Sequence, residues 1–369
     1  MIPFLELKPA YAELKDDIDA AVARVLGSGW YIGGPEVEAF EDQFARHCDA
    51  AHCIGVANGL DALHLSLRAL GVGEGDEVIV PSNTFIATWL AVTHAGAKPV
   101  PVEPREDTFN LDPDRVEDAI TPRTRAIIPV HLYGQPADLD AINAVARNHG
   151  LRVLEDAAQA HGARYKNRRV GAHSDLVSWS FYPGKNLGAM GDAGAITTDD
   201  ERLASELRRL RNYGSGQRYI NDVIGFNSRL DPVQAAILGA KLPHLDAWNE
   251  RRREIASVYQ ERLRDTGLIL PSSAGFADPV WHLYVVRHPR RDLLMRALEA
   301  RGIGSLIHYP VPPHRQRAYG SYATAALPIA ERMADQVLSL PMGPHLSVED
   351  AHNVADVMKE IIASGVLDG

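Results

Sequence analysis

The first half of the chain alternates short apolar runs with stretches of helical periodicity. After the apolar run at residues 52–56, four leucines recur at helical spacing and two glycines end the pattern: Leu60, Leu63, Leu67, Leu70, Gly71 and Gly73. Further strands are expected at residues 77–80, 98–102, 125–130, 151–154, 175–180 and 193–197, with helices between them that include 139–148 and 200–212. This alternation predicts an α/β fold with a mostly parallel central sheet flanked by helices.

A long charged helical segment runs from residue 245 to about residue 265 and divides the chain. The sequence has 369 residues, and because domains average about 150 residues, two domains are expected. We predict an N-terminal segment plus a large ligand-binding domain at residues 1–245, and a small C-terminal domain at residues 246–369.

Composition and charge exclude several classes of protein. Hydrophobic residues make up 46% of the chain and charged residues 23%, as in an ordinary globular protein. Since 38 basic and 48 acidic residues leave a net charge of −10, and no run of like charges stands out, a general nucleic-acid binder is not expected. No apolar stretch approaches the roughly 20 residues that a membrane-spanning helix needs. The first residues lack a basic segment followed by a long apolar one, so a cytoplasmic protein is expected.

Candidate ligand-binding residues follow the expected strands, because ligands of open α/β sheets bind beyond the carboxyl ends of the strands. The segment 58–61, Asn-Gly-Leu-Asp, lies between a strand and a helix. Free amide groups and the helix dipole favour a phosphate there, with an ordinary turn as the alternative. Asp156 follows an apolar strand directly and is placed to meet a ligand, with a helix N-cap as the alternative.

Lys185 connects these observations. It lies in a loop with proline and glycine between two expected strands, 29 residues after Asp156. A lysine, a strand-end aspartate and a phosphate cradle are the three groups that pyridoxal 5'-phosphate (PLP) requires. The amine forms the Schiff base, and the carboxylate keeps the pyridine nitrogen protonated so that the ring accepts carbanion charge. The alternative for Lys185 is a solvated surface charge.

Several motifs together resemble the DegT/StrS family of nucleotide-sugar aminotransferases, which are fold type I PLP enzymes. They stand at residues 29–35 (GWYIGGP), 58–63 (NGLDAL), 81–85 (PSNTF), 155–162 (EDAAQAHG), 180–186 (SFYPGKN), 225–230 (GFNSRL) and 308–310 (HYP). The resemblance extends over essentially the whole chain. It implies that the large domain binds PLP and that the smaller C-terminal domain is of the α+β class.

The resemblance implies a role around the cofactor ring for four residues. Lys185 would be the Schiff-base lysine and Asp156 the partner of the ring nitrogen, so these two are the expected catalytic residues. Phe85 would stack on the ring, with a plain core aromatic as the alternative. Gln159 would lie beside the ring hydroxyl.

It also implies which residues bind the cofactor phosphate. Ser180 and the backbone at Gly59 and Leu60 would be ligands within one chain. Many family members have a hydroxyl residue in place of Leu60, so only its backbone amide is expected to take part. Asn227 matches the residue that family members supply from the neighbouring subunit, which implies a homodimer with composite active sites. A turn residue is the alternative for Asn227.

Tyr182, His308 and Tyr309 are expected to bind the substrate by the same resemblance. His314 lies near the last two, but the spacing of the histidines fits no standard ligand pattern and no metal is expected. Cys48 and Cys53 are too few for a disulfide framework, and we expect free buried thiols rather than a zinc site.

The segment from residue 211 to residue 231 resembles the branch of the family that acts on dTDP-linked 3-oxo-6-deoxyhexoses. It implies amination at the C3 ketone to give a dTDP-3-amino-3,6-dideoxyhexose, with L-glutamate as the amino donor and 2-oxoglutarate as its product. Members that act at C4, on UDP-linked sugars or on scyllo-inosose share most of the motifs, and the gluco or galacto form of the sugar is not specified.

Two other functions compete with this interpretation. A PLP-dependent sugar dehydratase shares the fold, but it holds another base, usually histidine, where Lys185 stands. A catalytically silent regulator that binds PLP or a nucleotide sugar would keep the family motifs, but the intact set Asp156, Gln159, Ser180 and Lys185 disfavours it.

Overall fold

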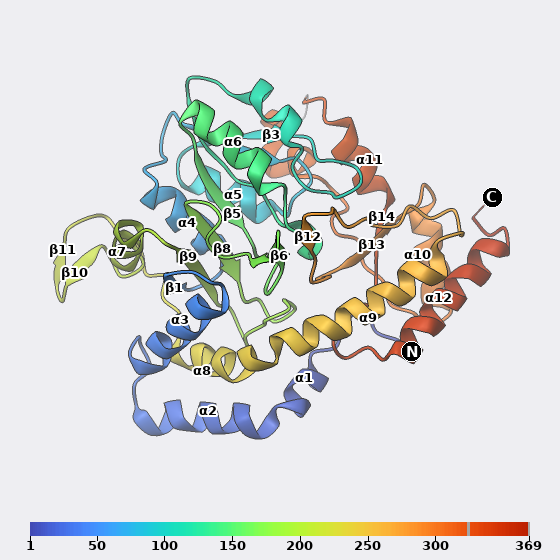
Figure 1. Ribbon diagram of the computed structural model, residues 1–369, viewed down its shortest axis with the longest axis horizontal. Helices are drawn as coiled ribbons and strands as arrows, with labels where there is room; N and C mark the ends of the chain where they lie inside the picture. The colour runs from blue at the N-terminus through green and yellow to red at the C-terminus, as the bar shows by residue number, and fades with distance from the viewer. Residues whose placement is uncertain (323–324, 368–369) are drawn as a thin grey trace.

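The computed structural model describes residues 1–322 and 325–367 and has a seven-stranded sheet at its centre (Figure 1). The strand order is β1-β9-β8-β5-β4-β2-β3. Strands β8, β5, β4, β2 and β3 are parallel, whereas β9 is antiparallel to both of its neighbours. The bounds are β1 (His52–Val56), β2 (Glu77–Pro81), β3 (Lys98–Val102), β4 (Thr124–Ile127), β5 (Arg152–Asp156), β8 (Leu176–Ser180) and β9 (Gly194–Thr198). The predicted α/β fold with a mostly parallel sheet is confirmed.

Helices cover both faces of the sheet, which explains why its strands read as continuous apolar runs. On β2, Val78 and Val80 pack with one buried cluster that includes α4, α5 and α7, while Ile79 packs with α6 on the other face. This alternation follows from the two-residue period of a strand. The helices are α4 (Gly59–Ala69), α5 (Ile86–His94), α6 (Leu139–His149) and α7 (Glu201–Leu210).

One predicted strand, 125–130, is too long: β4 ends at Ile127. Pro129 has no N–H to donate to a neighbouring strand, and beyond it Val130 forms only an isolated bridge with Asp156. The chain nevertheless stays beside the end of β5, because the Asp156 amide donates to the Pro129 carbonyl and the His131 amide donates to the Asp156 carbonyl.

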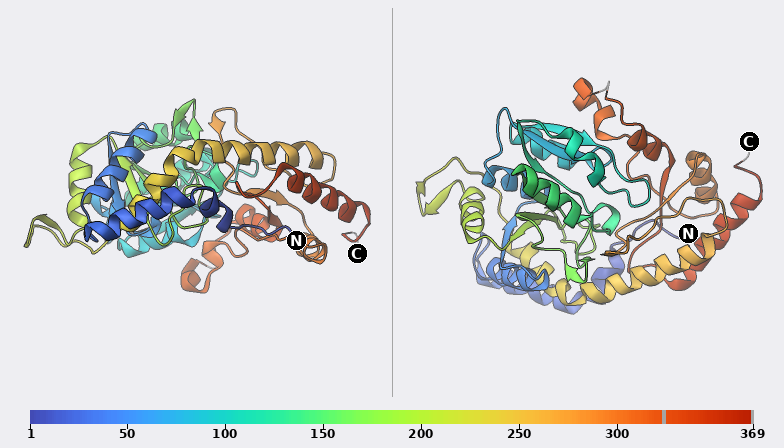
Figure 2. Two further views of the ribbon diagram at one scale, coloured as in Figure 1. Left: turned by 90° about the horizontal axis from the view of Figure 1, so that it is seen from below. Right: turned by 45° about the horizontal axis from the view of Figure 1, so that its top comes forward.

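Two small sheets extend from this core. Strands β12 (Ala277–Asp278), β6 (Arg164–Tyr165) and β7 (Arg168–Arg169) form one, and the hairpin β10 (Ser215–Gln217) and β11 (Ile220–Asn221) forms the other. The hairpin protrudes from the end of the molecule far from α12 (Figures 1 and 2). Exposed apolar side chains in and beside it are Tyr219, Ile220 and Ile224.

The C-terminal part packs helices on a two-stranded antiparallel sheet, β13 (Tyr284–Arg287) and β14 (Val337–Leu340). Its helices are α10 (Arg291–Ala300), α11 (Pro328–Gln336) and α12 (Val348–Ala363). The N-terminal helices α1 (Lys8–Glu13), α2 (Lys15–Ser28) and α3 (Pro35–His47) lie with α8 (Pro232–Lys241) along the lower side of the molecule in Figure 1.

Helix α9 (Leu245–Leu263) spans both parts of the molecule (Figures 1 and 2). Trp248, in its first turn, packs with Leu14 and Ile237 in an N-terminal cluster. Ile255 and Tyr259, farther along, belong to the core of the C-terminal part. A boundary at residue 245 stays a prediction, because this helix contributes to both cores.

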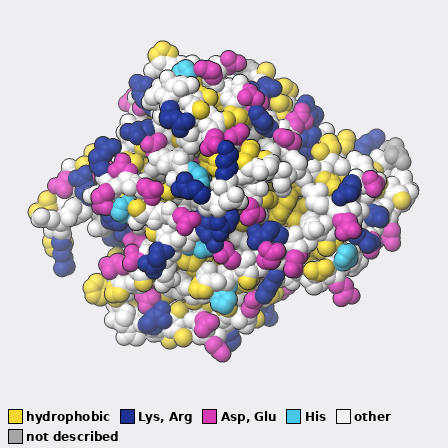
Figure 3. Space-filling model, in the orientation of Figure 1, with side chains coloured by type: hydrophobic (Ala, Val, Ile, Leu, Met, Phe, Trp, Pro, Cys, Tyr) yellow, Lys and Arg dark blue, Asp and Glu magenta, His cyan; other side chains and the backbone are white. Residues whose placement is uncertain are grey.

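The distribution of surface charges and the state of the two cysteine thiols are those of an ordinary globular protein. Basic and acidic side chains are intermixed over the face shown in Figure 3. Within residues 1–322 and 325–367, no helix combines the length and apolar character required to cross a bilayer. Cys48 and Cys53 are free and buried, as expected, and burial raises the pKa of both thiols.

Candidate active site

The anion cradle is predicted at the junction of β1 and α4. Asn58 caps the helix: its side-chain oxygen accepts a hydrogen bond of 2.8 Å from the Asp61 amide. Gly59 begins α4 against the end of β8, and a Cβ built on it would lie 2.5 Å from Cβ of Ser180. The helix N-terminus and the Ser180 hydroxyl are therefore brought together, and only glycine allows this approach.

Asp156 is buried at the carboxyl end of β5. Its Oδ2 accepts a hydrogen bond of 2.9 Å from Thr88 Oγ1, and its Oδ1 accepts one of 3.2 Å from the Ala158 amide. Burial raises the pKa of the carboxyl group, while these two hydrogen bonds and the charge of Lys185 counteract the rise. The site thus holds a carboxylate that is shielded from water and accepts hydrogen bonds from two protein donors.

Lys185 is partly buried in the loop after β8. Burial lowers the pKa of its amine to about 8, against a smaller opposing effect from the charge of Asp156. The two predicted catalytic residues are therefore close enough to influence each other's ionisation. A lysine with this pKa has a substantial neutral fraction near pH 8 and can act as a nucleophile and a base.

The loop that carries Lys185 is held at several points. The Lys185 amide donates 2.8 Å to the Tyr182 carbonyl. The buried Asn186 amide group donates 2.9 Å to Asn249 Oδ1 on α9 and 3.0 Å to the Val280 carbonyl. These contacts fix the backbone on both sides of the reactive amine.

Gln159 forms a second polar group beside Asp156. Its Oε1 accepts a hydrogen bond of 2.6 Å from the Tyr133 amide, and its Nε2 donates 3.1 Å to the Tyr309 hydroxyl. The ring of Tyr309 lies 5.2 Å from that of Phe85, centroid to centroid, at an angle of 39°. Phe85 is half exposed, so its ring is available to a ligand rather than packed into the core.

His308 faces this group from the C-terminal part of the chain. Its Nδ1 lies 2.8 Å from Ser339 Oγ, and its carbonyl accepts a hydrogen bond from the Tyr133 hydroxyl. Burial and the charge of Lys185 lower the pKa of the His308 imidazole to about 4, so the ring is neutral at pH 7. His314 instead pairs with Glu331 at 3.0 Å. Among the described residues, no group of three or more His, Cys, Asp or Glu side chains is arranged to hold a metal ion.

Two predicted site residues are exposed in the single chain. Tyr182 is 61% exposed, and its amide donates 3.3 Å to Ser180 Oγ. Asn227 is also exposed and forms a backbone bridge with Asn212. Their roles stay predictions, because both side chains face outward.

The sequence interpretation missed Thr88 and Tyr133. Thr88 lies in the first turn of α5, a mostly apolar helix, and its hydroxyl lies 2.9 Å from that of Thr84. Thr84 lies two residues before the start of α5, so the two threonines share no helix face, but a hydroxyl residue in the first turn of a mostly apolar helix directly after a ligand motif is a usable signal. Tyr133 offers no comparable signal: its position depends on contacts with residues far away in the sequence.

Comparison with known proteins agrees with this geometry. The family model of the DegT/DnrJ/EryC1/StrS aminotransferases matches residues 12–359. The dTDP-3-amino-3,4,6-trideoxy-alpha-D-glucose transaminase of Streptomyces venezuelae is 58% identical, over 97% of this chain and 96% of that protein. The dTDP-3-amino-3,6-dideoxy-alpha-D-galactopyranose transaminase of Aneurinibacillus thermoaerophilus is 51% identical, over 97% of this chain and 99% of that protein. The crystal structure of S. venezuelae DesV in complex with a ketimine intermediate has a TM-score of 0.97 at 57% identity and covers 98% of both chains.

Proposed function

Because this chain belongs to the DegT/DnrJ/EryC1/StrS aminotransferase family, we propose that it transfers the amino group of L-glutamate to the C3 ketone of a dTDP-3-oxo-6-deoxyhexose. The products are 2-oxoglutarate and a dTDP-3-amino-3,6-dideoxyhexose. The observation that carries the proposal is the meeting of Lys185 and Asp156 beside the Gly59–Ser180 cradle. The two relatives named above are C3 transaminases of dTDP-sugars by name.

The residues of this site fit PLP. A buried carboxylate with two donors suits a protonated ring nitrogen, an amine with a lowered pKa suits an aldehyde, and a helix N-terminus beside a serine suits a phosphate. Asp156 would hold the ring nitrogen, Lys185 the aldehyde carbon, and Ser180 with the backbone at Gly59 and Leu60 the phosphate. PLP, when bound, supplies an electron sink for the carbanion that forms at the amino-bearing carbon.

Lys185 would carry the proton in both halves of the reaction. Its Nζ would take the proton from the α-carbon of glutamate and pass it to the cofactor carbon that carries the nitrogen; in the second half it would take a proton from that carbon and give it to C3 of the sugar. The pKa of about 8 lets the amine accept the proton near neutral pH and hold it during each transfer.

The remaining site residues position these groups. Phe85 would stack on the cofactor ring. Gln159 would donate a hydrogen bond beside the ring hydroxyl, on the side where Tyr309 lies. Neutral His308 and the exposed ring of Tyr182 would line the sugar site with Tyr309. A neutral imidazole can accept or donate a hydrogen bond to a sugar hydroxyl without adding a charge.

The active form would be a homodimer in which Asn227 of one subunit completes the phosphate site of the other. The exposed side chain of Asn227 and the apolar surface of the β10–β11 hairpin support this arrangement, since exposed apolar surface beside a site is typical of an interface.

A second substrate deserves a direct test. The 58% identical relative is named for a 3,4,6-trideoxy sugar and the 51% identical relative for a 3,6-dideoxy sugar. The 4-deoxy ketone is therefore the second candidate, and the two differ only in the hydroxyl at C4.

The test uses the purified protein loaded with PLP. Glutamate should change the visible absorbance of the cofactor and release 2-oxoglutarate, and the correct keto sugar should restore the absorbance. We would add dTDP-3-oxo-6-deoxyglucose, its C4 epimer and the 4-deoxy analogue separately. Recovery with any one of them identifies the sugar. Glutamate turnover without recovery by all three would contradict the C3 assignment and direct attention to C4 ketones. Absence of 2-oxoglutarate would favour the silent regulator.

A further inference from the structure

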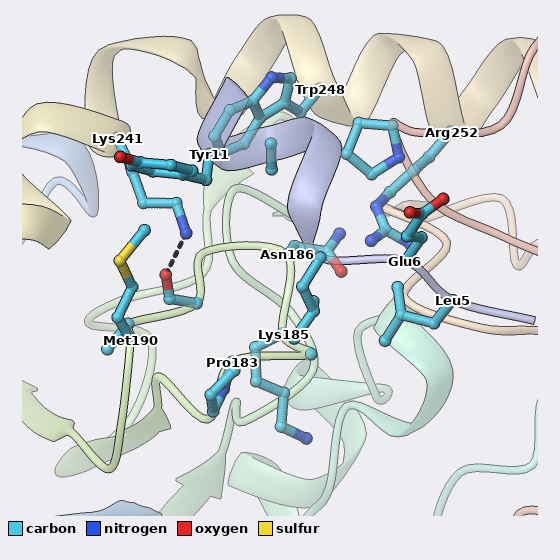
Figure 4. A pocket seen from close by; sticks show the side chains of 16 residues that line it. Leu5, Glu6, Tyr11, Pro183, Lys185, Asn186, Met190, Lys241, Trp248 and Arg252 are labelled. Atoms are coloured by element: carbon cyan, nitrogen blue, oxygen red, sulfur yellow. Dashed lines mark hydrogen bonds between the residues drawn. The ribbon is translucent and has the colours of Figure 1, made fainter. Parts of the chain in front are cut away.

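A cavity of about 280 Å³ lies behind the loop that carries Lys185. It is bounded by residues 5–7, 10 and 11 of the N-terminal segment, by residues 183–186 and 188–190 of the loop, and by α8 and α9 (Figure 4). Figure 4 shows the side chain of Lys185 running away from Lys241, Tyr11 and Trp248. Lys185 is itself among the lining residues, but its amine points away from the part of the cavity that Lys241, Tyr11 and Trp248 enclose.

Two buried cations line this cavity. Lys241 is 7% exposed, and its Nζ donates to the Gly188 carbonyl. Arg252 is 3% exposed; its Nη1 donates 3.1 Å to the carbonyls of Trp281 and His282, whereas its Nε is buried without a partner. Both side chains thus keep hydrogen-bonding capacity that the surrounding protein does not use.

Neither cation is balanced by a buried acid. Within the part of the chain that the structure describes, no ion pair joins Lys241 or Arg252 to a carboxylate, and burial alone lowers the pKa of each, to about 8 and about 10. The one acidic side chain among the lining residues, Glu6, is exposed. Buried charges in proteins are ordinarily paired, because an uncompensated one is costly. This cavity has the charge of a site for an anion.

Apart from Glu6, Lys185 and Asn186, the rest of the lining is apolar, aromatic or glycine. Leu5, Tyr11 and Trp248 surround the cations, and the Lys241 amine lies 5.9 Å from the centre of the Trp248 ring. A phosphate would lose the water around three oxygens on contact with these apolar surfaces. A carboxylate would lose the water around only two, and it can carry an apolar body that packs against them. A guanidinium also matches a carboxylate geometrically. The volume far exceeds the 10–15 Å³ that one water needs.

We propose that this cavity binds a small organic carboxylate, held by Lys241 and Arg252 with its apolar body against Tyr11 and Trp248. Lys241 also donates to Gly188 in the loop that carries Lys185, so the ligand would contact a residue that holds this loop. The site is separate from the cofactor and sugar sites proposed above and does not depend on the identity of the sugar.

The test is calorimetric titration of the PLP-loaded protein with benzoate. We expect one site per chain with a dissociation constant of about 1 mM, the range of a ligand of this size. Lys241→Met should weaken binding at least tenfold. Ala10→Leu should do the same by filling the cavity from α1 while both cations remain, and it should leave the absorbance response to glutamate unchanged. Lys8→Met is the matched control, because Lys8 is an exposed lysine of α1 outside the cavity lining.

The result is decisive even if Lys241→Met does not fold, because Ala10→Leu tests the same cavity by volume alone. Failure of benzoate to bind the wild-type protein, or wild-type affinity in Ala10→Leu, would overturn the proposal. An equal loss of benzoate affinity in Lys8→Met would also overturn the proposal, since the effect would then come from the overall charge of the protein and not from the cavity.

Discussion

The hydroxyl of Thr88 donates a hydrogen bond of 2.9 Å to Oδ2 of Asp156, joining helix α5 to the carboxyl end of β5. Burial raises the pKa of Asp156, and this hydrogen bond is among the interactions that lower it again. Thr88 therefore helps to keep the carboxylate ionised where a cationic ring nitrogen would need it.

Replacement of Thr88 by valine should move the acidic limb of the pH profile. Without the donor, the pKa of Asp156 rises further. On acidification, the carboxylate therefore becomes protonated at a higher pH than in the wild-type protein. A hydrogen bond to a charged group contributes about 1.5–3 kcal/mol, so we expect kcat/KM near pH 6 to fall roughly tenfold or more. The measurement is kcat/KM from pH 5 to pH 9. Thr88→Ser keeps the hydroxyl and should retain the wild-type profile; an unshifted limb in the valine variant would contradict the role of Thr88.

Replacement of Gly59 by alanine should weaken cofactor binding. The added Cβ would lie 2.5 Å from Cβ of Ser180, so the start of α4 and the end of β8 must separate and the phosphate cradle widens. We expect the dissociation constant for PLP to rise at least tenfold, measured by titration of cofactor-free protein. Gly27→Ala is the control, because a Cβ at Gly27 meets no atom within 4 Å. Equal affinities in the two variants would exclude Gly59 from the phosphate site.

The pKa of Lys185 predicts how fast cofactor-free protein takes up PLP at different pH values. Only the neutral amine attacks the aldehyde, and burial lowers the pKa of Lys185 from an ordinary value of 10.5 to about 8. The neutral fraction should therefore rise through pH 7 to 9 and then level off. Stopped-flow absorbance measures this rate directly. A rate that still climbs steeply at pH 10 would indicate a solvated lysine.

Mixing two inactive variants tests the composite site. Lys185→Ala and Asn227→Ala subunits should each form inactive or weakly active homodimers. If Asn227 acts in the partner's site, a mixed dimer has one intact site and one site with both defects. Random reassortment makes half of the dimers mixed, so about a quarter of the wild-type activity should return.

The same mixture gives a different result if Asn227 acts within its own chain. Each site of the mixed dimer would then contain one defect, and the activity would stay at the level of the unmixed variants. Co-expression with two different affinity tags isolates the mixed dimer and removes the need to assume random exchange.

Local patterns were sufficient to predict much of this molecule. The leucines from Leu60 to Leu70 specify α4 because their spacing marks one buried face. Asp156 ends β5 and Lys185 lies in the loop after the neighbouring parallel strand β8, so their meeting at one edge of the sheet follows from topology. The strand ending at Ile127 is shorter than predicted because the apolar run continues to Val130, whereas beyond Ile127 the ladder is continued only by an isolated bridge between Val130 and Asp156.

Long-range contacts could not be predicted in this way. Thr88 donates to a carboxylate that lies 68 residues later in the sequence, and no local sequence pattern predicts that contact. Lys241 is the one charged residue of α8 and Arg252 lies in the strongly charged α9, so local patterns would place both at the surface, yet both are buried. Burial of a charge depends on which segments pack over it, here the N-terminal residues and the Lys185 loop.

The sharing of α9 between two buried clusters has a consequence for protein engineering. A recombinant chimera with a relative, joined at residue 245, would set Trp248 of one parent against Leu14 and Ile237 of the other, and one joined after α9 would set Ile255 and Tyr259 of one parent against the C-terminal core of the other. A junction inside α9, between Trp248 and Ile255, keeps each end of the helix with the parent that supplies its packing partners. Exchange of the C-terminal part between homologues should therefore be made within this helix.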